Sequence, residues 1–329
     1  MHLKNKKVLV TGAGGFIGSH LTEYLVREGA EVRAVVHYNS RNDWGNLNFL
    51  PKDLLPEVDV HSIDITDPFS VRQVVEDCEC VFHLAALIGI PYSYLAPAAY
   101  FEVNVRGTLN VLEAVRAFQI PRMVHTSTSE TYGTARYTPM DEKHPLQGQS
   151  PYSASKIAAD KLVESYWCSF GLPVSTLRPF NTFGPRQSAR AVIPTIISQL
   201  KRDGKVRLGS LSPIRDFTYV TDTARAFVAV SESDSTLGIA CNAGNGQGIT
   251  IGDLANMLIG MVKPDAEIIC EEERKRPEKS EVKALIASTD LIRTLTSWKP
   301  QVSLKNGLSE VIDFVERHPK IFSVDQYVV

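Results

Sequence analysis

Tyr152 and Lys156 stand four residues apart and form the pair in this sequence best suited to acid–base chemistry. A helix is predicted to carry them, because Ser150 can cap a helix N-terminus and Pro151 fits the first helical position. Side chains four residues apart lie on the same face of a helix. An ammonium beside a phenol stabilises the phenolate and lowers the pKa of the tyrosine. Tyr152 is therefore predicted to act as a base near neutral pH.

The same spacing also occurs on amphipathic helices whose exposed tyrosine and lysine have no chemical role. A hydroxyl-rich segment upstream favours the functional interpretation. There a strand predicted to begin at Met123 runs into a hydroxyl-rich loop that contains Thr128 and Ser129 and ends at Glu130. Ligands of parallel sheets bind beyond the carboxyl ends of the strands, which is where these side chains would lie. The competing interpretation of Glu130 is a solvated loop acid.

A glycine-rich turn near the N-terminus predicts a site for a dinucleotide. Residues 7–10 have the pattern of a buried strand, and an amphipathic helix follows and ends near Gly29. Between them, Gly12, Gly15 and Gly18 give the spacing G-x-x-G-x-x-G. A glycine turn between a strand and a helix presents backbone N–H groups and the positive end of the helix dipole to a pyrophosphate.

The residue that contacts the adenosine ribose should follow the second strand, predicted at residues 31–36. Folds that prefer NAD usually place Asp or Glu there, about 20 residues after the glycines. Here that position holds His37, and Ser40 with Arg41 could bind a 2′-phosphate. The cofactor is therefore expected to be NAD or NADP, and the sequence leaves the choice open.

Strands alternate with helices along most of the chain, which predicts a parallel sheet with right-handed crossovers. The expected fold class is α/β, a Rossmann-type doubly wound parallel sheet with a smaller C-terminal α/β substrate domain. Further strands are predicted at residues 61–67, 80–86 and 173–178. His83 is expected to be a core histidine. The glycine turn, Ala85, the 128–130 segment and Asn181 all follow strands and should converge on one crevice.

The composition is that of an ordinary globular protein of 329 residues, with 43% hydrophobic and 22% charged residues. A net charge of −2 gives no indication of a nucleic-acid or membrane surface. No window approaches 18 uninterrupted apolar residues, and the apolar run after Lys7 is too short for a signal peptide. The five cysteines are scattered without zinc spacing. We expect free thiols, no metal site and a cytoplasmic location.

With these residues assembled, the chain resembles the extended short-chain dehydrogenase/reductase superfamily, and within it the nucleotide-sugar epimerases and dehydratases. The matching segments follow the order of that superfamily: Thr11–Gly18, Asp64–Ile65, His83–Ala86, Asn104–Thr108, Ser127–Gly133, Tyr152–Lys156, Arg178–Gly184, Arg215–Asp222 and Arg276–Pro277. A closer likeness links residues 86–94, 147–160, 188–196 and 276–281 to the 4,6-dehydratases of N-acetylglucosamine nucleotides in the legionaminic acid route.

The resemblance implies a reaction on a nucleotide sugar. Tyr152, made acidic by Lys156 and hydrogen-bonded to Thr128, takes the proton of the sugar 4-hydroxyl while hydride leaves C4 for the nicotinamide. Glu130 then removes the C5 proton, water leaves from C6, and the hydride returns to C6. Because the cofactor ends as it began, it is expected to stay tightly bound and to be recycled.

One position departs from the dTDP-glucose dehydratases, which carry Asp immediately before this Glu as the acid for the departing hydroxyl. Here that position is Ser129, and a serine hydroxyl is far too weak an acid to replace it. Thr-Ser-Glu occurs in GDP-mannose 4,6-dehydratases and also in UDP-glucuronate decarboxylases, so the motif does not separate these activities. The expected acid is Glu130 itself, which would pass the C5 proton to the leaving hydroxyl.

The resemblance also implies which residues bind the two ligands. The expected cofactor contacts are Gly12, Gly15, Phe16, Ile17, Gly18, His37, Asn39, Ser40, Arg41, Asp64, Ile65, Leu84, Ala85, Ala86, Asn104, Thr126, Tyr152, Lys156 and Pro179. The expected contacts of the nucleotide sugar are Ile88, Pro91, Tyr92, Glu130, Asn181, Arg186, Val192, Arg215 and Arg276. Of these, Arg215 and Arg276 are expected to hold the diphosphate, because guanidinium groups suit phosphate oxygens.

Two domains are expected. The dinucleotide-binding domain should span residues 1–180 and about 217–245, and the nucleotide-sugar-binding domain residues 181–216 and 246–329. Helices predicted at 104–118 and 152–170 carry apolar residues beyond one face. In the superfamily this pair forms a four-helix dimer interface, so a homodimer is expected.

The leading expectation is an NAD(P)-dependent 4,6-dehydratase that acts on UDP- or GDP-N-acetylglucosamine and gives a 4-keto-6-deoxy sugar. Three other functions stay open. A UDP-glucuronate decarboxylase needs a cation for the substrate carboxylate, for which no position is evident. A nucleotide-sugar 4-epimerase does not need an acid at Glu130. A catalytically dead dinucleotide-binding protein would keep the glycine turn and lose the tyrosine, whereas Tyr152, Lys156 and Thr128 are all present.

Overall fold

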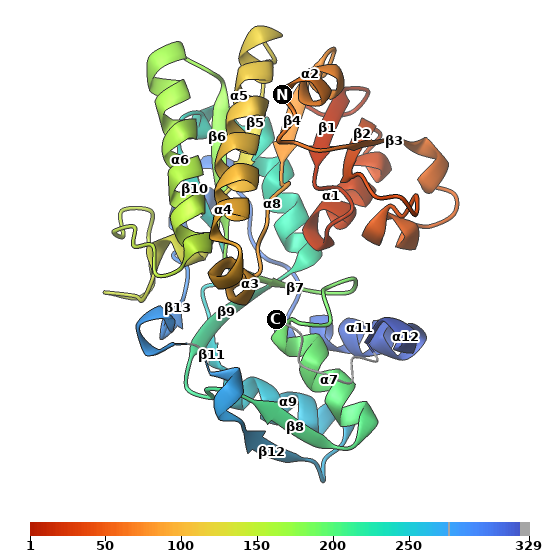
Figure 1. The fold of residues 1–329 in the computed structure, drawn as a ribbon, viewed down its shortest axis with the longest axis vertical. Coiled ribbons are helices and arrows are strands. Elements are labelled where there is room, and N and C mark those ends of the chain that lie inside the picture. Colours follow the sequence, from red (N-terminus) through yellow and green to blue (C-terminus); the bar gives the residue numbers. More distant parts are fainter. Residues whose placement is uncertain (276, 323–329) are drawn as a thin grey trace.

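A seven-stranded parallel sheet forms the larger part of the computed structural model, which describes residues 1–275 and 277–322 (Figure 1). The strands stand in the order β10-β6-β5-β4-β1-β2-β3, and all pairings are parallel. They are β1 (Lys7–Thr11), β2 (Glu31–His37), β3 (Val58–Ile63), β4 (Cys80–His83), β5 (Met123–Thr126), β6 (Val174–Pro179) and β10 (Ala240–Ala243). The chain order reverses beside β1, where ligands of such sheets bind. The predicted Rossmann-type fold is confirmed.

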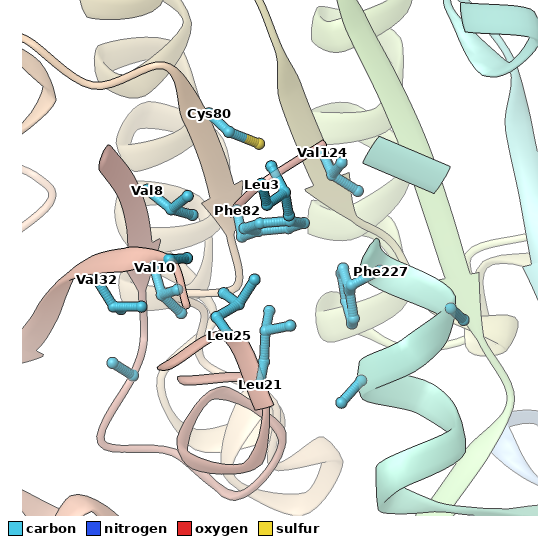
Figure 2. Packing of buried hydrophobic residues seen from close by; sticks show 14 of the residues in the cluster. Leu3, Val8, Val10, Leu21, Leu25, Val32, Cys80, Phe82, Val124 and Phe227 are labelled. Atoms are coloured by element: carbon cyan, nitrogen blue, oxygen red, sulfur yellow. The ribbon is translucent and has the colours of Figure 1, made fainter. Parts of the chain in front are cut away.

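The period-two alternation of the strands lets helices cover both faces of the sheet. Val8 and Val10 belong to one apolar cluster and Leu9 to another on the opposite face. On the first face, Figure 2 shows Phe227 beside Phe82 of β4, with ring centroids 6.3 Å apart. That face is covered by α1 (Phe16–Arg27), α8 (Val220–Glu232) and α10 (Asp290–Thr296). The other is covered by α2 (Pro68–Val75), α5 (Gly107–Ala117) and α6 (Pro151–Phe170).

Helix α6 begins and ends as local sequence dictates. Ser150 and Ser153 form a reciprocal capping box at its start, and Pro151 takes the first helical position. Gly171 ends it in the left-handed conformation, with φ 62°. The predicted helix start at this serine and proline is confirmed.

The helix predicted at 104–118 begins earlier than expected. α4 (Pro97–Phe101) continues through a π-helical turn (Glu102–Arg106) into α5. Pro97 suits a first helical turn, which the apolar pattern alone did not mark.

The strands predicted at 61–67 and 80–86 end earlier than expected. Polar side chains turn the chain just beyond them: Asp64 accepts hydrogen bonds from Thr66 and Thr11 accepts them from Leu84 and Ala85.

The remaining strands form two small sheets, which lie below the large sheet in Figure 1. These strands are β7 (Asn181–Phe183), β8 (Lys205–Leu208), β9 (Ile214–Tyr219), β11 (Gly248–Thr250), β12 (Glu267–Cys270) and β13 (Ala284–Leu285). Three helices share an apolar core with them: α7 (Val192–Arg202), α9 (Ile251–Val262) and α11 (Leu304–Arg317). The remaining α-helices are short: α3 (Ile90–Leu95) and α12 (Pro319–Phe322).

The chain crosses between the two parts at slightly different places than expected. β9 pairs with β7 and β11 as far as Tyr219, so the return to the large sheet comes at α8 instead of at about residue 217. Ile292 and Trp298 pack in the core of the large sheet, although residues 246–329 were expected in the smaller part. The Trp298 indole Nε1 donates to the carbonyl of Asp222 at 3.0 Å, which anchors this segment to α8. The domain division otherwise stays a prediction.

In residues 1–275 and 277–322, no helix combines the length and the apolar character needed to cross a bilayer. All five cysteines are free thiols. Cys78, Cys80 and Cys241 are buried, whereas Cys168 and Cys270 are exposed.

Candidate active site

Loops that follow neighbouring strands meet at one edge of the large sheet. They are residues 12–15 after β1, 84–89 after β4, 127–130 after β5 and Phe180 with Asn181 after β6. Since β1, β4, β5 and β6 are adjacent and parallel, their carboxyl ends lie side by side. The structure therefore brings together the segments that were expected to converge.

Tyr152 and Lys156 are buried on α6, one helical turn apart. The Lys156 Nζ donates to the backbone carbonyl of Thr126 at 2.6 Å, which fixes the ammonium at the end of β5. Burial lowers the pKa of Lys156 to about 8, and the Asp160 carboxylate acts in the opposite direction. The Tyr152 ring packs edge-on against Tyr100, with centroids 6.2 Å apart.

The prediction that the pKa of Tyr152 is lowered is wrong for this structure. Burial raises the pKa of the phenol, and hydrogen bonding with Thr128 opposes that shift only in part. The nearby charge of Glu130 raises the pKa further. The Lys156 ammonium donates to the Thr126 carbonyl, and the net shift of the Tyr152 pKa remains upward. A further cation beside the ring would favour the phenolate.

The loop after β5 gives Ser129 and Glu130 different surroundings. Thr128 caps a short 3-10 helix (Ser129–Tyr132) and accepts a hydrogen bond from the Glu130 backbone N–H at 3.3 Å. Ser129 is only 3% exposed, whereas Glu130 is half-buried and close enough to Tyr152 to affect its pKa. Ser129 is therefore shielded from solvent, whereas Glu130 is a partly accessible carboxylate near the tyrosine.

The glycine turn forms a cradle that side chains would fill. Gly12 has φ 71°, and a Cβ there would stand 2.8 Å from the backbone nitrogen of Ala85. A Cβ on Gly18 would stand 2.1 Å from the Gly12 carbonyl oxygen. Gly15 occupies the N-cap of α1 without any side-chain cap, so the first N–H groups of the helix face the turn. This arrangement fits the pyrophosphate of a dinucleotide.

Thr11 joins this turn to the loop after β4. Its Oγ1 accepts hydrogen bonds from the backbone N–H groups of Leu84 and Ala85, both at 3.1 Å. It also lies 2.9 Å from Nδ1 of His83, whose Nε2 lies 3.0 Å from the Thr108 hydroxyl. His83 is buried, and burial lowers its pKa. The prediction of a core histidine is confirmed.

The end of β2 carries no carboxylate toward the expected ribose position. His37 is exposed, and its Nε2 lies 3.9 Å from a carboxylate oxygen of Asp64. Asn39 orders the next loop, because its Oδ1 accepts hydrogen bonds from the backbone of Arg41 and Asp43, both at 3.1 Å. The Arg41 side chain is exposed beside this loop.

Two residues expected to contact the cofactor are used within the protein instead. Asn104 lies buried in the π-helical turn and donates to the Leu87 carbonyl at 2.9 Å and to the Ser155 hydroxyl at 3.0 Å. Its Oδ1 accepts from the Leu87 N–H at 2.8 Å. Asn104 thus fastens the loop after β4 to α6. Ile65 is buried and packs over Gly107, so it belongs to the core.

A cavity of about 1530 Å³ is lined by residues of the small sheets and their helices, together with Pro91 of α3. Its walls include four of the residues expected to bind the nucleotide sugar, namely Pro91, Asn181, Val192 and Arg215. Arg215 is held at the wall by a hydrogen bond from Nη1 to the Val282 carbonyl at 2.8 Å. The Asn181 Oδ1 is buried without a hydrogen-bond partner among the described residues. Ligand pockets typically occupy about 300–1,000 Å³, so the cavity has room for a nucleotide sugar.

Arg186 does not line this cavity, and its expected contact with the substrate stays a prediction. Its Nη2 lies 2.5 Å from a carboxylate oxygen of Glu23 on α1 and donates to the Phe49 carbonyl at 3.3 Å. Its backbone φ of 68° turns the chain at this point. Arg186 thus anchors the segment after β7 to α1. Arg276, the second expected diphosphate ligand, lies outside the described residues.

The position of Tyr100 beside Tyr152 was not predicted from the sequence. Tyr100 donates to the Gly89 carbonyl at 2.5 Å, and its ring lies 6.2 Å from both Tyr92 and Tyr152 between centroids. No spacing in the sequence distinguishes it from a core residue. Asp160 was also missed, although its signal was present: it follows Lys156 at the spacing that separates Lys156 from Tyr152.

Known proteins resemble this chain over most of its length. The chain matches the family described as GDP-mannose 4,6 dehydratase over residues 9–311. It is 31% identical to the UDP-glucuronate 4-epimerase of Thermodesulfobacterium geofontis over 316 residues, which cover 93% of this chain and 95% of that protein. It is 30% identical to the dTDP-D-glucose 4,6-dehydratase of Mus musculus over 322 residues, 95% of this chain and 89% of that protein.

A solved structure shows the same fold with cofactor. The dTDP-glucose 4,6-dehydratase DesIV of Streptomyces venezuelae, with NAD bound, has a TM-score of 0.86 and 25% identity to this chain, covering 96% of this chain and 99% of that one. The family match spans most of the chain, and the expected superfamily is thereby confirmed. The chain belongs to the GDP-mannose 4,6-dehydratase family of extended short-chain dehydrogenases/reductases, among the sugar-nucleotide dehydratases and epimerases.

Proposed function

We propose that this protein is an NAD(P)-dependent 4,6-dehydratase of an N-acetylhexosamine nucleotide, with UDP- or GDP-N-acetylglucosamine as substrate. The observation that carries the proposal is the Glu130 carboxylate, which lies close enough to Tyr152 to affect its pKa and sits on the loop beside it. Oxidation at C4 needs only the tyrosine, whereas removal of the C5 proton needs a second base. Glu130 supplies that base, and a 4-epimerase has no use for it.

The glycine cradle and the loops after β2, β4 and β5 would hold the cofactor. Gly12, Gly15 and Gly18 provide space and backbone N–H groups for its pyrophosphate, and Leu84 with Ala85 closes the cradle from the side of β4. When bound, the cofactor would supply a nicotinamide able to take up and return a hydride. The positive charge of the nicotinamide would also favour the phenolate of Tyr152.

In the first stage Tyr152 accepts the proton of the sugar 4-hydroxyl. The Lys156 ammonium is fixed at the end of β5, one helical turn from Tyr152, and Thr128 hydrogen-bonds to the phenol and orients the base. The packing of Tyr152 against Tyr100 restricts the ring to one position. These contacts place the proton acceptor before the substrate arrives, as general base catalysis requires.

In the second stage Glu130 removes the C5 proton, which the C4 ketone has made acidic. The C6 hydroxyl must then leave as water, and it needs a proton to do so. Ser129 is buried and too weak an acid, so Glu130 passes the proton it has just taken to the leaving hydroxyl. When C6 receives the hydride, C5 gains a proton that balances the one Tyr152 took from the 4-hydroxyl, and the 4-keto-6-deoxy sugar is complete.

The nucleotide part of the substrate belongs in the cavity of about 1530 Å³. Arg215 at its wall would pair with the diphosphate, and Asn181, which also lines the cavity, offers an unpaired carbonyl oxygen. The preference for an acetamido sugar rests on the resemblance of residues 86–94, which include Ile88, Pro91 and Tyr92, to the N-acetylglucosamine-nucleotide dehydratases. The legionaminic acid route is the corresponding biosynthetic expectation.

The quaternary structure and location are part of the same proposal. Phe101 and Leu109 are exposed on the continuous helix formed by α4 and α5, 46% and 36% respectively, and this helix packs beside α6. A second copy would cover these side chains in a four-helix homodimer. The free cysteines are consistent with a location in the reducing cytoplasm.

The test is the variant Glu130→Gln, which keeps the shape of the side chain and removes the base. We expect the variant to oxidise C4 of UDP- or GDP-N-acetylglucosamine, seen as reduced nicotinamide absorbance, without releasing a dehydrated sugar. Glu142→Gln serves as the matched control, because Glu142 is a partly buried carboxylate that accepts a hydrogen bond from the backbone N–H of Asn242. Dehydration by Glu130→Gln at close to the wild-type rate would remove Glu130 from the mechanism.

A further inference from the structure

A buried ion pair lies under the catalytic residues, and the mechanism above does not use it. Asp160 stands on α6, and its Oδ2 accepts hydrogen bonds from Arg178 Nη2 at 2.9 Å and from the Ser127 hydroxyl at 2.6 Å. Its Oδ1 lies 3.1 Å from Nε2 of His125. All four side chains are buried. The carboxylate thus joins α6 to β5, to the loop after β5 and to β6.

The guanidinium of Arg178 holds the same loop at both ends. Its Nε donates to the Ser127 hydroxyl at 3.2 Å, and its Nη1 donates to the Tyr132 hydroxyl at 2.7 Å. It also lies over the Tyr132 ring, 4.7 Å from the centroid. Ser127 and Tyr132 flank the segment that contains Thr128 and Glu130. Tyr132 is fixed in turn by a hydrogen bond to Asn242 at 2.8 Å.

We propose that Asp160 and Arg178 are positioning residues, which hold the Thr128–Glu130 segment in register with Tyr152 and set the charge that faces Lys156. Tyr152, Lys156 and Asp160 follow one another at intervals of four, so the carboxylate lies on the same face of α6 as the ammonium. A neutral side chain at this place would keep the packing and lose the counter-charge.

Several titratable groups pack around the Asp160 carboxylate and experience its charge. These groups are Lys156 and Tyr152 on α6, His125 on β5, Arg178 on β6 and Tyr132 on the loop; His83 lies one layer further, with its ring 5.9 Å from that of His125. Asp160 raises the pKa of Lys156, whereas burial lowers it. Removing the negative charge should therefore let Lys156 lose its proton at lower pH.

The first experiment compares Asp160→Asn with Asp222→Asn over a range of pH. Asp222 is the matched control, since it is a fully buried carboxylate that pairs with Arg225 and accepts from the backbone of Gln301 and Val302, remote from Tyr152. The readout is the rate of cofactor reduction on mixing with nucleotide sugar. We expect the basic limb of the profile to move to lower pH by at least roughly 0.5 unit in Asp160→Asn only. An unshifted limb in Asp160→Asn would overturn the electrostatic role.

A milder variant covers the case in which Asp160→Asn does not fold. Ser127→Ala removes the hydroxyl that both Asp160 and Arg178 bind and leaves the ion pair itself in place. We expect its kcat to fall at least about tenfold with KM changed less than about twofold, because the loop moves relative to Tyr152 while the cavity is untouched. An unchanged kcat would overturn the positioning role.

The inference rests on the proposed function for the identity of the substrate, but not for the cofactor-reduction step that the experiment measures. Cofactor reduction is the first step for a dehydratase, an epimerase or a decarboxylase, so the assay reports on Asp160 whichever product forms. If the wild-type protein reduces no cofactor with any nucleotide sugar, the proposed function fails. Amide hydrogen exchange of residues 127–132 then tests the positioning on its own. Faster exchange in Asp160→Asn than in Asp222→Asn supports it, and equal exchange overturns it.

Discussion

Replacing Lys156 by methionine should stabilise the protein while abolishing its activity. Burial lowers the pKa of Lys156 from its ordinary value of 10.5 to about 8. A shift of this size means that the charged side chain costs the folded state about 3 kcal/mol at neutral pH. Methionine avoids this cost at similar helix propensity but loses the hydrogen bond from Nζ to the Thr126 carbonyl, which we set at about 1–2 kcal/mol. The net gain expected is about 1–2 kcal/mol.

The pH dependence of this gain follows from the direction of the shift. The unfolded chain binds the Lys156 proton more tightly than the folded protein does, so the cost is fully present below about pH 8. It fades as the pH rises toward 10.5, the ordinary value for a lysine. The advantage of Lys156→Met should therefore be largest near pH 7 and should disappear at about pH 10.

Urea unfolding of the nucleotide-free protein, followed by circular dichroism at both pH values, measures the difference. Lys161→Met is the matched control: Lys161 is on the same helix but exposed, and its Nζ lies 2.5 Å from a carboxylate oxygen of Glu164. This control should change the free energy of unfolding by less than about 0.5 kcal/mol. If Lys156→Met were less stable than wild type at pH 7, the buried ammonium would not be a cost and the reasoning would be refuted.

Three further predictions test the cradle, the cavity and the assembly. Gly18→Ala should abolish cofactor binding in a fluorescence titration, since its Cβ would stand 2.1 Å from the Gly12 carbonyl oxygen; normal binding would contradict the cradle. Arg215→Met should raise KM at least about tenfold. Arg186→Met should lower the melting temperature and leave KM nearly unchanged. The reverse pattern would identify Arg186 as the substrate ligand. Light scattering should show a homodimer that Leu109→Glu converts to monomer, and a monomeric wild-type protein would disprove the interface.

Features that depend on neighbouring residues were predictable from the sequence. The capping box at Ser150, the glycine turn and the alternating strands each act within a few residues, and the structure contains all three. The convergence of loops at one sheet edge was also predictable, because parallel strands align their carboxyl ends.

Features that depend on distant contacts were not predictable. Arg186 looks like a substrate ligand in the sequence, and only the folded chain shows Glu23 beside it. Asn104 sits in the expected motif, yet its amide is used by Leu87 and Ser155. The pKa of Tyr152 rises because of burial, which the spacing to Lys156 does not report. In each case the deciding partner lies far away in sequence or is the packing itself.

The central claim is that the protein removes water from a nucleotide sugar, and mass spectrometry of its products tests that claim most directly. The purified protein would be incubated with UDP- and GDP-N-acetylglucosamine, dTDP-glucose, GDP-mannose and UDP-glucuronate. We predict the loss of one water from an N-acetylglucosamine nucleotide, and the substrate consumed identifies the base. Loss of carbon dioxide from UDP-glucuronate alone, or an epimer of unchanged mass detected by NMR, would contradict the claim.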